Sequence, residues 1–193
     1  QPGEALARVD RAMAAVRQDP DAAGMLPELE RLQVETRLEA GDLAAAGRLL
    51  DLHANRVRQD PAWALLRGRW YNQMLQPKQA IAVLQPMLEL TATKDARDRR
   101  ATGLRWQLAD AWRLSGRYEE ALRILDRCIE WQSASLPADH PALALTRLRR
   151  IDVLVRLRRA DEALQMARTL DQNIRAWYGE DNTLAARAAN SLA

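Results

Sequence analysis

Residues 108–128, LADAWRLSGRYEEALRILDRC, decide the fold of this chain. Leu108, Ala109 and Trp112 are spaced so that they share one face of a helix. Gly116 follows them and supplies the permissive backbone that ends such a helix. A second apolar stripe then runs through Tyr118, Ala121, Leu122, Leu125 and Cys128. Two stripes joined by a turn predict a helical hairpin, and no stretch of the sequence shows the sustained alternation that is typical of a strand.

The same hairpin pattern recurs along the sequence. The alanines that open each apolar face are separated by 41, 34, 41 and 42 residues, at Ala5, Ala46, Ala80, Ala121 and Ala163. Independently, the letters VRQDP occur at 16–20 and again at 57–61, an interval of 41 residues. Because two unrelated landmarks give the same period, the sequence predicts a repeat protein in which each hairpin buries its apolar face against its neighbours.

This pattern resembles the tetratricopeptide repeat (TPR), in the long 41–42-residue form found in kinesin light chains and many bacterial regulators. The fourth unit departs from the pattern, because Arg158 replaces the turn glycine and Ala160 replaces the aromatic residue after it. The resemblance implies an all-α fold, a right-handed superhelical solenoid of antiparallel helix pairs. It implies one TPR-like domain over residues 1–193, which divides into a half-repeat at 4–18, repeats at about 25–57, 61–91, 98–133 and 141–177, and a terminal helix at 183–193.

Composition excludes several classes of protein. With 48% hydrophobic residues the chain is too apolar to be disordered, and it lacks an apolar run long enough to cross a membrane. A single cysteine excludes an intrachain disulfide and a multi-cysteine metal site. The chain begins at Gln1 without a leader-like segment and ends at Ala193 in a helix-like stretch, so we expect a piece of a longer protein or a mature chain. A cytoplasmic location is favoured, and a periplasmic one is the alternative if a cleaved leader or a transmembrane helix precedes the chain.

The sequence predicts no catalytic residue, no cofactor and no metal site, and therefore not an enzyme. His53 and Cys128 each lie seven residues after an opening alanine. Cys128 is expected to pack in the core, and His53 is expected to be partly buried and hydrogen-bonded. His140 lies in an Asp-His-Pro loop, and the resemblance to long TPR repeats implies that this loop has a structural role. Paired metal-binding histidines, glycine-rich phosphate loops and nucleophile elbows are absent from the sequence.

Nucleic-acid binding is weighed and disfavoured. The net charge is only +3, although six arginines fall within 13 residues, at Arg147, Arg149, Arg150, Arg156, Arg158 and Arg159. A helix spreads these arginines over several faces, acidic residues lie beside them, and no aromatic residue interleaves with them to stack on bases.

The concave surface of such a solenoid is the predicted binding site. The residues 15, 11, 8 and 7 positions before each opening alanine are expected to face it: Arg31, Glu35, Leu38 and Glu39; Leu65, Arg69, Asn72 and Gln73; Trp106, Asp110, Arg113 and Leu114; Leu148, Asp152, Val155 and Arg156. The candidate partner-binding residues among them are Glu35, Arg69, Asn72, Gln73, Trp106, Asp110, Arg113, Asp152 and Arg156.

Trp106 is the expected centre of this groove. Flanked by Arg69 and Arg113, it has the composition of a binding hot spot, and replacing it by alanine is then expected to abolish partner capture at unchanged stability. The alternative is that Trp106 packs against the neighbouring repeat. The basic and amide clamp of chaperone-tail-binding relatives is not reproduced, because Asp110 and Asp152 stand at its positions, so an extended or helical peptide of mixed charge is favoured.

Three functional hypotheses follow. The leading one is a non-enzymatic protein- or peptide-binding TPR scaffold within a larger bacterial regulatory protein. The alternative is an effector- or signal-peptide-sensing domain that controls an attached output domain, such as a transcription regulator or a kinase. The third is self-assembly into a homo-oligomer through the exposed ends of the solenoid.

Overall fold

The computed structural model describes residues 2–92 and 99–179, and these residues form helices and no strand. In chain order the helices are α1 (Pro2–Gln18), the 3₁₀ helix η1 (Pro20–Met25), α2 (Leu26–Glu39), α3 (Leu43–Leu52), α4 (Ala54–Gln59), α5 (Pro61–Gln73), α6 (Pro77–Ala92), α7 (Arg99–Leu114), α8 (Tyr118–Ser135), α9 (Pro141–Arg156) and α10 (Ala160–Tyr178). The terminal helix predicted at 183–193 lies outside the described residues.

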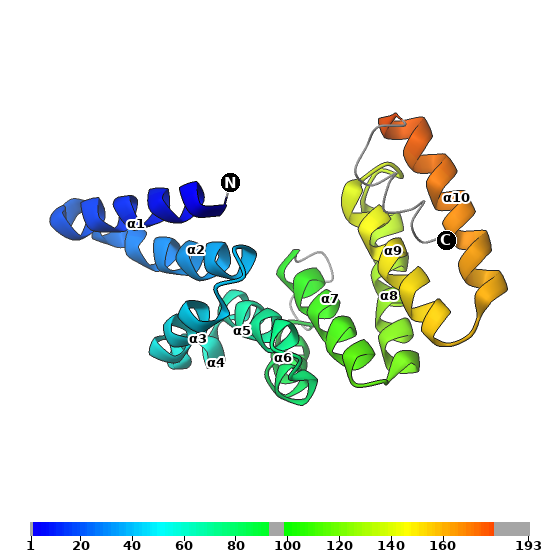
Figure 1. Cartoon of the computed structure of the whole chain (residues 1–193), viewed down its shortest axis with the longest axis horizontal. Coiled ribbons are helices and arrows are strands. Elements are labelled where there is room, and N and C mark those ends of the chain that lie inside the picture. Colours follow the sequence, from blue (N-terminus) through cyan, green and yellow to red (C-terminus); the bar gives the residue numbers. More distant parts are fainter. Residues whose placement is uncertain (1, 93–98, 180–193) are drawn as a thin grey trace.

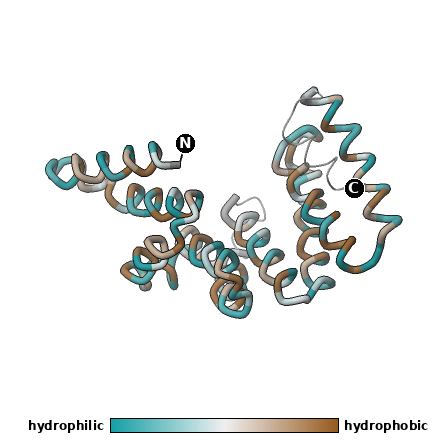
Figure 2. Tube along the Cα trace, in the orientation of Figure 1, coloured by the Kyte–Doolittle hydropathy of each residue, from teal (hydrophilic) through white to brown (hydrophobic). Residues whose placement is uncertain are grey.

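The helices stack along the chain as a solenoid. Each packs mainly on its neighbours in sequence: α5 contacts α6 and α7, α7 contacts α8, and α9 contacts α8 and α10. Figure 1 shows the resulting arc, with α1 and α2 at one end and α9 and α10 at the other. Apolar and polar residues are interspersed along the helices (Figure 2), as expected for helices that bury one face only. The predicted all-α arrangement of antiparallel helix pairs is confirmed.

The turns inside the helix pairs share one backbone feature. A residue with positive φ lies five positions before each of four opening alanines: Gly41 (76°), Leu75 (56°), Gly116 (77°) and Arg158 (61°). This left-handed conformation lets the chain leave one helix and begin the next. Arg158 therefore fills the place of the turn glycine, as the sequence pattern indicates, whereas Leu75 carries no such signal.

The repeated VRQDP motif caps helices in both of its copies. The Asp60 carboxylate accepts a hydrogen bond of 2.8 Å from the Ala62 amide, and Pro61 opens α5. The Asp19 carboxylate likewise accepts one of 3.0 Å from the Asp21 amide at the start of η1. Asp and Pro suit these two positions, because the carboxylate satisfies a free amide and proline needs no donor in the first turn.

Close helix contacts within and between pairs depend on glycine. A Cβ atom built on Gly68 of α5 would lie 2.5 Å from Cγ of Leu84 on α6, and Leu84 is fully buried. A Cβ on Gly47 of α3 would lie 2.8 Å from the ring of Trp70 on α5. The Trp70 indole N–H also donates a 2.7 Å hydrogen bond to the Leu43 carbonyl, so the ring is fixed at this junction.

His53 and Cys128 occupy packing positions. Cys128 is 1% exposed, and burial raises the pKa of its thiol to about 11, so it is a protonated core residue at neutral pH. His53 lies where α3 ends and α4 begins, with its ring 4.6 Å from that of Trp63 and its Nε2 atom 3.8 Å from a Glu30 carboxylate oxygen. The packing role predicted for Cys128 is confirmed. His53 is partly buried as expected, but its contact with Glu30 is longer than the expected hydrogen bond.

Candidate functional site

Trp106 joins two successive repeats. Its indole N–H, on α7, donates a 2.9 Å hydrogen bond to the Thr146 hydroxyl on α9, which in turn donates to the Ala142 carbonyl. The guanidinium of Arg149, also on α9, lies 4.9 Å from the centre of the ring. The ring packs against the core shared by α8, α9 and α10. Trp106 thus packs against the next repeat, as the alternative interpretation expected, and its cationic neighbour is Arg149.

Four charged side chains on α7 and α9 form an alternating network beside Trp106. Arg113 Nε lies 3.4 Å from an Asp152 oxygen and 3.7 Å from an Asp110 oxygen. Arg149 Nε lies 3.9 Å from the other Asp110 oxygen. These residues line a depression of about 370 Å³ between the two helices. We call Asp110, Arg113, Arg149 and Asp152 the charge network.

Asp110 is the member of this network whose carboxyl is perturbed by burial. Burial raises the pKa of this carboxyl above the ordinary value, and the neighbouring Asp152 carboxylate acts in the same direction. Arg149 and Arg113 oppose this shift without cancelling it. The Asp110 carboxyl therefore holds a proton more readily than an ordinary aspartate does.

The remaining predicted groove residues lie apart from this network or at its edge. Arg156 Nε is 3.9 Å from Asp152, and Arg69 is 3.9 Å from Glu39. The Gln73 amide donates a 3.3 Å hydrogen bond to the Leu38 carbonyl, and Glu35 is half-buried on α2.

Two predicted groove positions belong to the core, and a third serves helix packing. Leu38 and Leu148 are 1% and 8% exposed and lie in the core clusters. Asn72 is also buried, and its amide nitrogen donates to the backbone carbonyl (2.8 Å) and side-chain oxygen (3.0 Å) of Gln107 on α7. Of the predicted groove residues, the structure thus brings together Asp110, Arg113 and Asp152. Asn72 instead joins α5 to α7 through its hydrogen bonds to Gln107.

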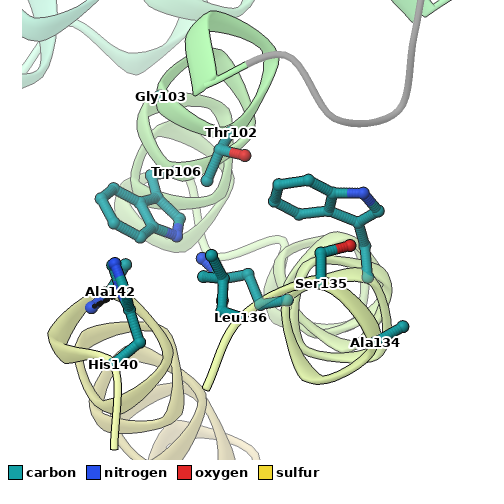
Figure 3. Close-up of a pocket in the computed structure, with 10 residues that line it drawn as sticks. Thr102, Gly103, Trp106, Ala134, Ser135, Leu136, His140 and Ala142 are labelled. Carbon is teal, nitrogen blue, oxygen red and sulfur yellow. Dashed lines mark hydrogen bonds between the residues drawn. The ribbon is translucent and has the colours of Figure 1, made fainter. Parts of the chain in front are cut away.

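Sequence reasoning missed a cavity at the junction of α7, α8 and the start of α9. It has a volume of about 780 Å³ and is lined by Thr102, Gly103, Trp106, Trp131, Gln132, Ala134, Ser135, Leu136, His140 and Ala142. Figure 3 shows Trp106 and His140 on one side, Ser135 and Ala134 on the other, and Leu136 between them. A signal was present: Gln132 continues the buried spacing of Ala121, Leu125 and Cys128, where an apolar residue is expected.

Acidic neighbours balance most of the six clustered arginines. Arg150 lies 2.6 Å from Asp126 and 2.8 Å from Glu162, which ties α9 to α8 and α10. The Arg159 guanidinium also pairs with Glu162. In residues 2–92 and 99–179 there is no cluster of three potential metal ligands, and no helix there is both long and apolar enough to cross a membrane.

These features define a class, a helical-repeat protein with the TPR-like solenoid fold. The chain is similar to a variant of the nearly identical TPR-like repeats of a Podosopora anserina protein assigned as a kinesin light chain (16% identity, TM-score 0.74, covering 84% of this chain and 81% of that one). It is also similar to BtubC (BKLC) from P. vanneervenii (15% identity, TM-score 0.73, covering 100% of this chain and 82% of that one). No family model and no curated protein matches the sequence. The structural likeness confirms the predicted TPR-like fold.

Proposed function

We propose that this chain is a non-enzymatic scaffold that binds a protein or peptide, as a module of a larger bacterial regulatory protein. The charge network carries the proposal. Its side chains are between 27% and 46% exposed, so they are reachable and yet partly desolvated. Charges held in such a setting contribute more to recognition than fully solvated ones. The TPR-like fold supports a scaffold role through its extended surface.

The expected partner is a peptide segment of mixed charge. Positive and negative side chains alternate within the network. A partner whose acidic and basic residues follow the complementary order can therefore form ion pairs with Asp110, Arg113, Arg149 and Asp152. A partner of one sign would meet a like charge at every second position, which costs binding energy.

A displayed library of random peptides tests this proposal. Peptides selected on the wild-type chain should carry both signs of charge, and Arg113→Glu should weaken their binding by about tenfold or more. Arg168→Glu is the matched control, because Arg168 is exposed on α10. The double variant Arg113→Glu/Asp152→Arg restores an opposite-charge pair and separates loss of folding from loss of binding. If the selected peptides bind the Arg113→Glu variant as tightly as the wild-type chain, the proposed role of the charge network in peptide binding is refuted.

Sensing of a small effector is a second candidate function. One observation favours it: the cavity of about 780 Å³ falls in the size range of small-molecule sites and lies where two repeats meet. An effector bound there would contact α7, α8 and the start of α9 together.

A further inference from the structure

Aromatic and small side chains form the described walls of the cavity between α7, α8 and the start of α9. Two indoles, Trp106 and Trp131, line it together with Leu136 and small residues. None of the described lining residues is Lys, Arg, Asp or Glu. Such a surface favours a neutral ligand with a planar ring, because a charged one would lose its hydration without gaining an ionic partner.

Gln132 is the unusual residue of this cavity. It is 1% exposed, and neither its amide nitrogen nor its amide oxygen has a hydrogen-bond partner among the described residues. Leaving a buried polar group unpaired destabilises the folded chain. The rest of the stripe on α8 is apolar, so packing alone would be served better by leucine.

Thr102 repeats this feature on the opposite helix. It is 8% exposed on α7, and its buried hydroxyl has no partner among the described residues. Two unpaired polar side chains from two helices therefore line one cavity. Buried polar groups in proteins are nearly always satisfied, so this coincidence indicates a missing partner.

His140 adds a polar group to the lining of the cavity. Its Nδ1 accepts a 3.1 Å hydrogen bond from the Ala142 amide and caps α9. In the neutral ring the hydrogen therefore resides on Nε2, which is a donor. This capping bond holds the imidazole in place without using its donor.

We propose that this cavity binds a small, uncharged, planar heteroaromatic molecule that carries an amide donor and acceptor side by side, as in a lactam ring. The ring stacks on the indole walls, and its N–H and C=O pair with the Gln132 carboxamide in two antiparallel hydrogen bonds. Gln132 lines the cavity, but both of its polar atoms are covered from solvent in this structure. The proposed hydrogen bonds therefore require its side chain to rotate toward the ligand. This proposal rests on residues other than the charge network and is independent of peptide binding there.

Matched bicyclic probes test the proposal by calorimetric titration of the whole chain. The lactam 2-quinolone should bind, quinoline, which lacks the amide, should bind about tenfold more weakly, and the anion quinoline-2-carboxylate should bind more weakly still. Gln132→Leu should reduce 2-quinolone affinity by about tenfold and leave quinoline unchanged. The same substitution should raise the melting temperature, because it removes an unpaired amide from the core.

Two controls make the result decisive. Gln79→Leu changes an exposed glutamine on α6 and should leave 2-quinolone binding intact. Arg113→Glu should also leave it intact, so failure of the charge network and failure of the cavity give different results. Absence of 2-quinolone binding, equal affinity for quinoline, or unchanged affinity in Gln132→Leu would each overturn the proposal.

Discussion

Arg149 lies over Trp106, with its guanidinium carbon 4.9 Å from the ring centre, and the two residues belong to successive repeats. The Trp106 indole also donates to Thr146 on the same helix as Arg149. One side chain of α7 is thus fixed by two residues of α9.

Replacing Trp106 by alanine should therefore lower stability. We expect a loss of about 3 kcal/mol in the free energy of unfolding, because an aromatic side chain that joins two helices is removed. Trp106→Phe should lose less, since the ring remains and only the hydrogen bond to Thr146 is lost. Urea unfolding followed by circular dichroism measures both changes. Unchanged stability in Trp106→Ala would restore the sequence-based expectation of a purely binding role.

Gly68→Ala should destabilise the contact between α5 and α6. Alanine is the better helix former, but its Cβ would meet the buried Leu84 side chain, and we expect a net loss of roughly 1–3 kcal/mol. Gly24→Ala is the matched control, because a Cβ there meets nothing within 4 Å. A gain of stability in Gly68→Ala would show that Leu84 can move aside.

Leu75→Gly should stabilise the chain. Leu75 is 73% exposed with a φ of 56°, so glycine relieves backbone strain at little cost in packing, and we expect a gain of about 0.5 kcal/mol. Leu52→Gly makes the same change at the last residue of α3, which is 77% exposed and has no positive φ, so it should cost up to about 1 kcal/mol. Chemical denaturation of the two variants should give changes of opposite sign in the free energy of unfolding. Changes of the same sign would contradict the inference that the Leu75 backbone is strained.

His53 should make stability depend on pH. Burial lowers the pKa of its imidazole below 6.5, and Arg56 acts in the same direction against Glu30. The unfolded chain therefore binds more protons in the window just below 6.5, and stability falls as the pH falls through it. Urea midpoints at about pH 7.5 and about pH 5.5 should differ less in His53→Gln than in wild type. Equal differences would show that His53 does not contribute.

The sequence was sufficient for the features that local chemistry determines. Gly116 and the buried opening alanines from Ala46 onward follow from helical spacing and from the need for a permissive turn residue, and both are where the pattern predicts them. Leu75 could not be foreseen as a left-handed residue, because leucine is disfavoured there and only the packing of α5 on α6 imposes it.

The site was less predictable than the fold. Helical spacing indicates which side of α7 carries Trp106 and Asp110, but the partners of these residues depend on how α9 docks. For this reason the cation over Trp106 is Arg149, which the sequence analysis groups with the clustered arginines. Gln132 was not singled out from the sequence, although it interrupts the apolar stripe of α8, and only the packed structure shows that its amide is unpaired.

Because its helices contact mainly their neighbours in sequence, this solenoid can bend at the junctions between its repeats. The two ends are joined through a series of short junctions, and the main contacts among the described helices do not bridge distant repeats. A small rotation at one junction would therefore displace the far ends of the arc by more than it displaces the junction itself. The cavity lies at such a junction, so a ligand that wedges α7 slightly away from α8 and α9 would swing the terminal helices, and anything attached to them, through a much larger distance.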